Sequence, residues 1–191
     1  MTNTAPTKID HGRACLLITG PPGAGKSTVA ALIAGVLTRA ALLRGDLVGR
    51  LVTSGYVWPL GDPADEAARQ VRLCNHNLTT LAGNFADQQF TPVIDWIVPD
   101  RDQLDFFRDA LHPHPLLLVV LTPSPQVCRS RNEQRAPEEQ FSFDGHNELL
   151  ASMWDGFGNL GWWLDSSDLT AESTASLIGQ HALDRALIVD D

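Results

Sequence analysis

The sequence has few cysteines, few basic residues and no long apolar run, and each shortage excludes a class of protein. The three cysteines, Cys15, Cys74 and Cys128, stand at unrelated spacings in 191 residues, so neither a disulfide framework nor a cysteine metal cluster is predicted. We expect buried free thiols in a reducing compartment. Basic residues number 14 against 23 acidic ones, and the formal charge of −9 argues against broad attraction to nucleic acid or anionic membranes.

No apolar run approaches the roughly 18 residues that a membrane span needs. The first stretch, "MTNTAPTKIDHGR", is polar and lacks the apolar centre of a signal peptide, so a cytoplasmic protein is expected. The hydrophobic fraction of 43% and the charged fraction of 19% are ordinary for a globular protein. Without internal repeats or low-complexity linkers, residues 1–191 are predicted to form one domain, with 1–12 as a disordered leader.

Apolar strands and amphipathic helices alternate along the chain. This alternation predicts an α/β fold in which a parallel sheet is covered by helices on both faces, with any ligand at the carboxyl ends of the strands. Strands are expected at 14–19, 40–46, 90–98, 115–122 and 161–167. Helices are expected at about 26–39, 47–54, 64–85, 101–111, 125–131, 147–157 and 170–183, with Asp100 and Thr170 as N-caps.

The stretch "GPPGAGKS" matches the phosphate-binding pattern G-x-x-x-x-G-K-[ST] in full. Glycines let backbone amides turn around a phosphate, and the following helix adds the positive end of its dipole. Lys26 can reach the β- and γ-phosphates of ATP, and Ser27 can ligate Mg²⁺. A chance glycine-rich turn is the alternative, but the strand before it and the helix after it supply the required context. The predicted ATP-binding residues are Gly20, Pro21, Pro22, Gly23, Ala24, Gly25, Lys26, Ser27 and Thr28.

With this loop, the chain resembles the small-molecule kinases of the P-loop class, among them gluconate, shikimate and nucleoside monophosphate kinases and above all proteins like chloramphenicol phosphotransferase. The resemblance covers nearly the whole chain, although only the phosphate loop is highly specific. The supporting motifs are Gly45-Asp46, "PVIDWIV", the pair Arg131 and Arg135, and "WLDSSDLTAE". It implies a P-loop NTPase three-layer α/β/α sandwich with a five-stranded parallel sheet of order 2-3-1-4-5. It also implies a short lid at about 132–145.

Asp46 follows the second predicted strand, where these kinases place an acid that contacts the acceptor hydroxyl. The resemblance therefore implies that Asp46 binds substrate and serves as the general base or as a positioning group. The alternative is that Asp46 only caps the helix that follows it, as aspartate often does.

Asp95 interrupts the apolar strand "VIDWIV", where a lone carboxylate is costly unless it is paired or near a metal. It is predicted to hold Mg²⁺ or to contact the acceptor. The alternative is a strand-end aspartate bonded to a neighbouring loop. Relatives often have two consecutive acids here, whereas this chain has Asp95-Trp96, so the division of roles between Asp46 and Asp95 stays open.

Three arginines stand at the base of the polar segment "RNEQRAPEEQFSFDG". If this segment is a lid, Arg131 and Arg135 are catalytic groups that neutralise charge on the transferring phosphoryl group, and Arg129 binds the nucleotide. One of the arginines could instead stack on adenine. The alternative is a solvated helix face.

Two further residues are candidates for the acceptor site. Asn75 stands beside the apolar stripe of the long helix and could bind substrate, although a satisfied buried amide is the more common arrangement. Tyr56, in the loop after Asp46, could form a wall of the acceptor pocket or simply pack there.

The predicted function is transfer of the γ-phosphate of Mg-ATP to a hydroxyl of a small molecule, such as an antibiotic, a sugar or a nucleoside-like compound. The alternative is an ATP-binding antibiotic-resistance protein of the tunicamycin-resistance type, which acts by binding its drug. A nucleotide switch is disfavoured because no guanine-specificity motif N-K-x-D is present. The acidic charge disfavours a polynucleotide kinase.

Overall fold

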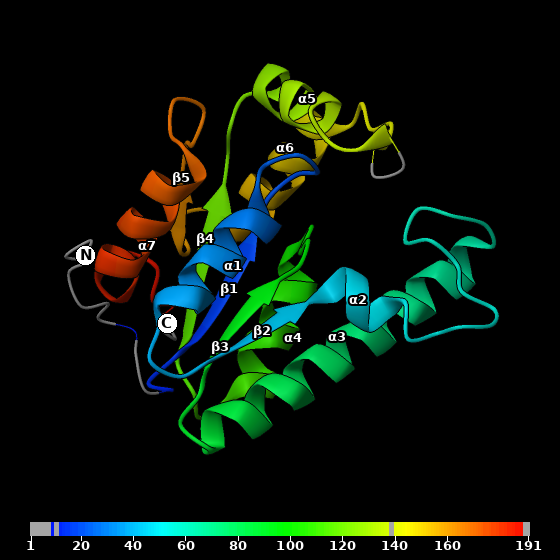
Figure 1. The fold of residues 1–191 in the computed structure, drawn as a ribbon. Helices are drawn as coiled ribbons and strands as arrows, with labels where there is room; N and C mark the ends of the chain where they lie inside the picture. The colour runs from blue at the N-terminus through cyan, green and yellow to red at the C-terminus, as the bar shows by residue number, and fades with distance from the viewer. Residues whose placement is uncertain (1–8, 10–11, 138–139, 189–191) are drawn as a thin grey trace.

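The computed structural model describes residues 9, 12–137 and 140–188, which are built around one five-stranded parallel sheet (Figure 1). Its order, β2-β3-β1-β4-β5, confirms the predicted one. Arg44, Ile18 and Asp95 stand in register, so the carboxyl ends of three neighbouring strands meet at one edge. The strands are β1 (Cys15–Thr19), β2 (Ala40–Arg44), β3 (Thr91–Asp95), β4 (Leu116–Leu121) and β5 (Trp162–Leu164).

Helices cover both faces of the sheet, as the alternating pattern predicted (Figure 1). The predicted caps are confirmed, because Asp100 accepts a hydrogen bond from the Gln103 amide and Thr170 accepts one from the Ser173 amide. The helices are α1 (Lys26–Val36), α2 (Gly45–Gly49), α3 (Ala64–Asp87), α4 (Arg101–Leu111), α5 (Pro125–Glu133), α6 (His146–Phe157) and α7 (Ala171–Arg185).

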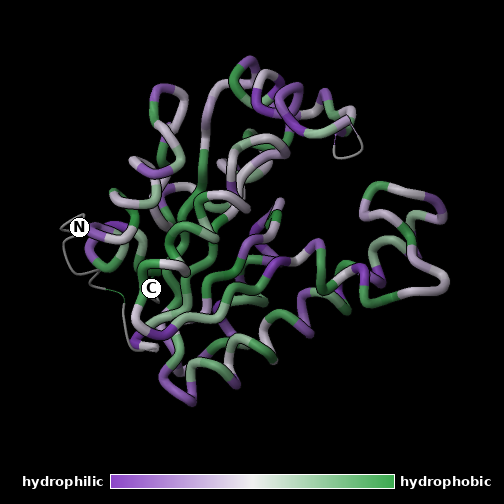
Figure 2. The backbone as a smooth tube through the Cα atoms, in the orientation of Figure 1, coloured by the Kyte–Doolittle hydropathy of each residue, from purple (hydrophilic) through white to green (hydrophobic). Residues whose placement is uncertain are grey.

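The central strands divide their side chains between two apolar cores. Leu16 and Ile18 of β1 pack in one core with residues of α1 and α7, whereas Cys15 and Leu17 pack in the other with residues of α3, α4 and α6. Figure 2 shows the hydrophobic residues gathered along these strands. Each fully buried leucine contributes roughly 1.5–3 kcal/mol, so the strands are held from both sides and fix the loops at their ends. All three cysteines are buried and free, as predicted.

Some element boundaries differ from the prediction. β2 ends at Arg44 instead of Asp46, and α2 begins at Gly45, two residues earlier than expected, and ends at Gly49. β3 ends at Asp95 instead of residue 98, because the Val98 amide donates to the Thr19 hydroxyl rather than to a strand. α1 ends at Val36 instead of about residue 39, because Leu37 is extended.

The predicted disordered leader, 1–12, falls largely outside the described residues. Within them the prediction is wrong at two positions. Ile9 is fully buried and its carbonyl accepts a hydrogen bond from the Thr91 hydroxyl at 2.9 Å, and the Gly12 amide donates to the same hydroxyl at 3.1 Å.

The predicted lid, 132–145, runs from the end of α5 to the start of α6, and residues 138 and 139 lie outside the described ones. Asn132 holds the segment at its base, because its side chain bonds both the carbonyl and the amide of Phe141. No helix within the described ranges is long and apolar enough to cross a membrane.

Candidate active site

The loop between β1 and α1 has a backbone shape that depends on glycine. Gly20, Gly23 and Gly25 have φ values of 138°, 79° and 95°, in the region that other residues rarely adopt. A Cβ atom on Gly20 would lie 2.3 Å from the Leu121 carbonyl oxygen, and one on Gly23 would lie 2.5 Å from that of Cys128. Residues with side chains would therefore be strained at these positions and would clash with the neighbouring backbone. Helix α1 begins directly after this loop.

Lys26 is buried in this loop at the N-terminus of α1. Its ammonium donates to the carbonyls of Gly20 and Pro21, each at 2.9 Å. Burial lowers the pKa of Lys26, and the negative charges of Asp95 and Asp46 oppose that shift. The structure thus brings the lysine of the phosphate loop together with both predicted acids.

Asp95 is only 6% exposed, at the carboxyl end of β3. Its carboxylate accepts a hydrogen bond from the Ser27 hydroxyl, and the Nε atom of Arg44 lies 3.9 Å from its Oδ2. Burial is nevertheless the largest influence and raises the pKa of Asp95. A buried carboxylate beside a hydroxyl of the phosphate loop suits a cation. No three His, Cys, Asp or Glu side chains form a metal site within the described chain, so Mg²⁺ held here would take its other ligands from phosphate and water.

Replacing Asp95 with asparagine is expected to stabilise the protein by about 1 kcal/mol at neutral pH. A raised pKa means that the folded protein binds this proton more tightly than the unfolded chain does. Protonated Asp95 therefore stabilises the wild-type protein fully below the ordinary aspartate pKa, and this contribution is lost as pH rises through the raised pKa. The gain from Asp95→Asn is accordingly absent at low pH and appears as pH rises. Urea denaturation at several pH values measures this, with the exposed Asp168→Asn as control. A less stable Asp95→Asn would show that the carboxylate is structural.

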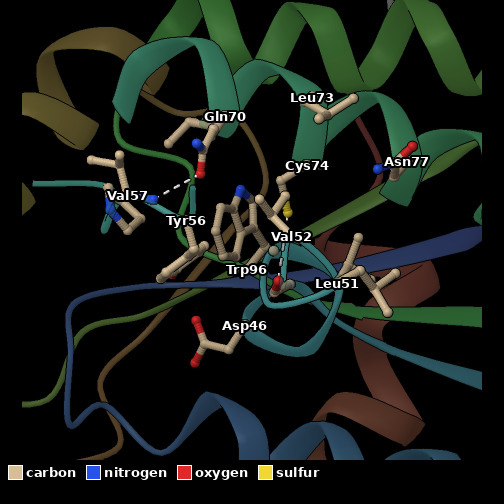
Figure 3. A pocket seen from close by; sticks show the side chains of 15 residues that line it. Asp46, Leu51, Val52, Tyr56, Val57, Gln70, Leu73, Cys74, Asn77 and Trp96 are labelled. Carbon is tan, nitrogen blue, oxygen red and sulfur yellow. Dashed lines mark hydrogen bonds between the residues drawn. The ribbon is translucent and has the colours of Figure 1, made fainter. Parts of the chain in front are cut away.

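Asp46 stands in the first turn of α2 and lines a cavity of about 240 Å³ between α2, the loop 50–63 and α3, here called the α2–α3 cavity (Figure 3). The alternative that Asp46 caps this helix is wrong, because the cap position is Arg44 and no side chain bonds there. Tyr56 also lines this cavity. The lining residues are Gly45, Asp46, Val48, Gly49, Leu51, Val52, Tyr56, Val57, Pro59, Gln70, Val71, Leu73, Cys74, Asn77 and Trp96.

Trp96 forms one wall of the α2–α3 cavity, a role that the sequence did not reveal. Its indole lies so close to Gly45 that a Cβ atom on the glycine would be 1.9 Å from the Trp96 Cε3 atom. Gly45, noted in the sequence only as part of a motif, is therefore required for the packing of this wall.

We expect Gly45→Ala to lower the free energy of unfolding by about 1–3 kcal/mol, because the methyl group forces the indole out of its place. Chemical denaturation measures the loss. Gly35→Ala is the matched control, since nothing lies within 4 Å of its added Cβ atom, and it is expected to stabilise α1 slightly. Equal effects of the two substitutions would contradict the close packing of Trp96 on Gly45.

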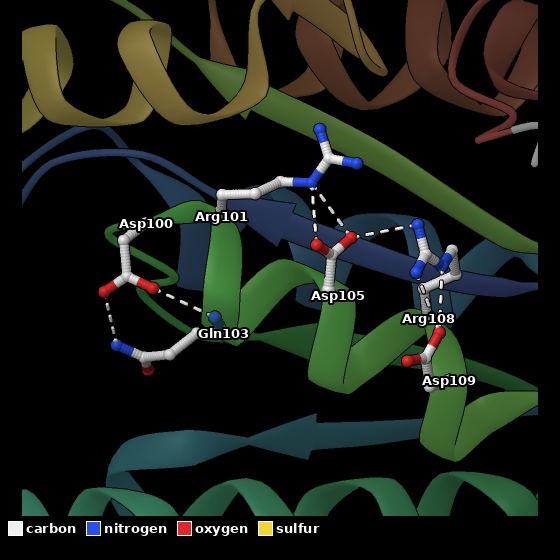
Figure 4. A network of polar contacts seen from close by, with 6 residues as sticks. All are labelled: Asp100, Arg101, Gln103, Asp105, Arg108 and Asp109. Carbon is white, nitrogen blue, oxygen red and sulfur yellow. Dashed lines mark hydrogen bonds and ion pairs between the residues drawn. The ribbon is translucent and has the colours of Figure 1, made fainter. Parts of the chain in front are cut away.

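The prediction that Asn75 binds substrate is not supported, because its buried amide is used within the protein. Its Oδ1 accepts from the Trp96 indole nitrogen at 2.8 Å, and its Nδ2 donates to Gln103 at 3.1 Å. Gln103 in turn bonds Asp100, the cap of α4 (Figure 4). Asn75 is therefore a buried amide with satisfied hydrogen bonds, the alternative given above, and it orients the Trp96 indole.

Gln70, which no sequence pattern singled out, holds the loop that carries Tyr56. Its Oε1 accepts from the Val57 amide at 2.9 Å, and its Nε2 donates to the Gly55 carbonyl at 2.7 Å. The available signal was a polar residue on the buried face of α3, one turn before Cys74.

The three arginines that follow β4 make different contacts in the structure. Arg131 donates to the carbonyls of Ala24, Ser166 and Leu169, so it ties the phosphate loop to the segment after β5. Arg135 lies over the Phe141 ring at 5.1 Å, and its charge contributes to lowering the pKa of Lys26.

Arg129 is exposed and lines a second hollow of about 170 Å³ between α5 and residues 141–146. His146, another missed residue, lines this hollow and its Nε2 lies 3.1 Å from the Pro22 carbonyl oxygen. Its buried Nδ1 has no hydrogen-bond partner within the described structure. The start of α6 therefore touches the phosphate loop.

Comparison with known proteins gives one family and many similar structures. The model of the family described as AAA domain matches residues 16–160. A search of curated proteins finds no match.

Three similar solved structures are a sugar kinase, a tunicamycin resistance protein and an APS kinase. The unliganded sugar kinase, from Janibacter sp., is 19% identical with a TM-score of 0.64, covering 91% of this chain and 95% of that one. The tunicamycin resistance protein of Deinococcus radiodurans is 18% identical with a TM-score of 0.62, and the match covers 93% of this chain and 99% of that one. The APS kinase of Mycobacterium tuberculosis, in complex with AMPPNP and APS, is 17% identical with a TM-score of 0.63. The match covers 91% of this chain and 96% of that one. At these identities the likeness shows the fold alone.

Proposed function

The chain belongs to the AAA domain family and has a P-loop kinase-like fold, and on this premise we propose that it transfers the γ-phosphate of ATP to a hydroxyl of a small molecule. One observation carries the proposal. Asp46 lines the α2–α3 cavity and also acts electrostatically on Lys26 of the phosphate loop. A hydroxyl bound in the cavity would therefore meet a carboxylate beside the place where phosphates are expected.

In the proposed reaction the acceptor oxygen attacks the γ-phosphorus, and the bond from this phosphorus to the oxygen that bridges it to the β-phosphorus breaks. The electron pair leaves with ADP, and the hydroxyl proton passes to Asp46, which acts as the base. Phosphoryl transfer needs positioning and charge stabilisation more than covalent chemistry. Lys26 exchanges its two carbonyl partners for phosphate oxygens, and Arg135 adds a second positive charge.

Ser27 and Asp95 are the residues that would hold Mg²⁺, which neutralises charge on the β- and γ-phosphates when bound. This assignment separates the two acids. Asp95 is buried beside Ser27 and is not a lining residue of the α2–α3 cavity, whereas Asp46 lines it. We therefore assign acceptor contact and proton transfer to Asp46 and the metal to Asp95.

Arg131 and Arg129 take different parts in the proposal. Arg131 is bound to three carbonyls and so acts as a positioning residue that fixes the phosphate loop, in place of the catalytic role expected from the sequence. Arg129 stays a candidate for nucleotide contact at the second hollow.

The test is incubation of the protein with γ-labelled ATP, Mg²⁺ and a panel of hydroxylated compounds, followed by separation of labelled products. Acceptor-dependent labelling supports the proposal. Tight binding of a compound with no labelled product from any acceptor would overturn it in favour of a protein that acts by binding its ligand, the alternative expected from the resemblance to tunicamycin-resistance proteins.

A further inference from the structure

The α2–α3 cavity is unsuited to an anionic ligand. Its fifteen lining residues, all in the described chain, include no lysine, arginine or histidine (Figure 3). Their single charged member is Asp46, which would repel a second negative charge. Four arginines stand on the surrounding elements, but none of them is a lining residue. Arg44 lies beside Asp95, and Arg69 is paired with Glu66. Arg50 acts on Tyr56 from outside the lining, and Arg72 is exposed on α3.

The cavity also offers few free polar side chains. Gln70 uses both ends of its amide on Gly55, Val57 and Glu66, and the Cys74 thiol donates to the Gly45 carbonyl. Among the lining side chains this leaves Asp46, Tyr56 and Asn77 to meet a ligand. A polyol bound here would have more hydroxyls than partners, and each unpaired buried hydroxyl is costly.

One wall of the cavity is the indole of Trp96, an apolar surface with a fixed orientation. The Trp96 indole packs on Gly45 and donates its N–H to Asn75, and Asn75 is itself bonded to Gln103. Because its polar atom is satisfied from behind, the indole presents only carbon to the cavity. Such a surface favours an aromatic or aliphatic partner.

Apolar side chains continue from the cavity onto its rim. Leu51 is 71% exposed and Leu73 is 43% exposed, and both belong to the lining. Large exposed apolar side chains that adjoin a cavity are surface that a ligand can cover. The ligand surface would therefore be apolar beyond the part enclosed by the cavity.

We propose that the acceptor is an uncharged alcohol with an aromatic or aliphatic body, which packs against Trp96 and the leucines of the rim while its hydroxyl meets Asp46. This inference rests on the proposed function for the reacting hydroxyl, but the class of ligand follows from the cavity itself. Discrimination comes from the missing cation and the few free polar groups, which exclude hydroxy acids and polyols.

The experiment tests the 191-residue chain with three ligands, which are phenylpropanol, its ring-carboxylated analogue and sorbitol. Calorimetric binding in the presence of a non-hydrolysable ATP analogue and transfer from labelled ATP are measured in parallel. We expect phenylpropanol to be favoured over each of the other two by at least about tenfold in both Kd and kcat/KM.

Leu73→Arg adds a cation to the rim at a position exposed enough to accept it. We expect the substitution to raise the Kd of phenylpropanol about tenfold and to lower the Kd of the carboxylated analogue by a similar factor. Leu81→Arg is the matched control, since Leu81 lies on the same helix, is 37% exposed and does not line the cavity. Leu81→Arg should leave the Kd of both ligands unchanged.

The outcomes separate the two proposals. Transfer to sorbitol or to the carboxylated analogue in preference to phenylpropanol overturns the inference and leaves the phosphotransferase intact. Binding of phenylpropanol that Leu73→Arg weakens and Leu81→Arg does not, without labelled product from any probe, supports the inference and overturns the proposed function. If phenylpropanol is neither bound nor phosphorylated, the inference is overturned.

Discussion

Replacing Asp46 with asparagine is expected to lower kcat by about 10²–10⁴-fold, the range over which a positioned general base acts. Asparagine keeps the size of the side chain but cannot take the proton of the acceptor hydroxyl. The KM for ATP should stay within about threefold, because the lost interaction forms mainly in the transition state. Steady-state kinetics with each substrate varied in turn measures the two parameters.

Two controls sharpen this result. Asp62→Asn removes an exposed carboxylate from the loop before α3, outside the α2–α3 cavity, and should leave kcat unchanged. Asp95→Asn should raise the Mg²⁺ concentration that half-maximal activity requires, which Asp46→Asn should not. An unchanged kcat in Asp46→Asn would remove this residue from the chemistry and transfer the role of base to another group.

Replacing Lys26 with methionine is expected to lower kcat/KM by about 10²–10³-fold, the loss usual when one preorganised donor to developing charge is removed. Methionine fills a similar volume without the ammonium. The folded protein should lose little stability, because burial already disfavours the charged form and lowers the pKa of Lys26. Single-turnover transfer and urea denaturation measure the two effects.

A chemical experiment on the unmutated chain tests the same assignment. The sequence has two lysines, Lys8 and Lys26, so an amine-specific reagent followed by mass spectrometry can report each one. Mg-ATP should reduce labelling of Lys26 relative to Lys8, because phosphate oxygens would accept hydrogen bonds from the Lys26 ammonium and shield it from the reagent. Equal labelling with and without nucleotide would show that ATP does not bind at this lysine.

The sheet and the phosphate loop could be predicted because their signals are local. Apolar runs that end at glycine or at an acid mark strands and their carboxyl ends, and this brought Asp46 and Asp95 to the correct edge of the sheet. The loop 20–27 carries its own pattern, so Lys26 and Ser27 were identified without knowledge of their neighbours.

The wall of the α2–α3 cavity could not be predicted, because it depends on contacts between separate segments. Trp96 follows β3, but its orientation is set by Gly45 at the start of α2 and by Asn75 in the middle of α3. Arg131 is a similar case. The sequence identified it as a charge near a lid, whereas its three carbonyl partners come from the phosphate loop and from the segment after β5.

The lining of the α2–α3 cavity has an unusual distribution along the chain. Apart from Trp96, every lining residue falls within 45–77, an unbroken stretch that contains none of the loop residues 20–27. One contiguous exchange of sequence, together with a change at position 96, would therefore replace the whole lining of the α2–α3 cavity, which is the proposed acceptor site, and leave residues 20–27 unchanged. Such a cassette is a practical unit for grafting between related chains, and it allows acceptor preference to diverge by recombination of a single segment.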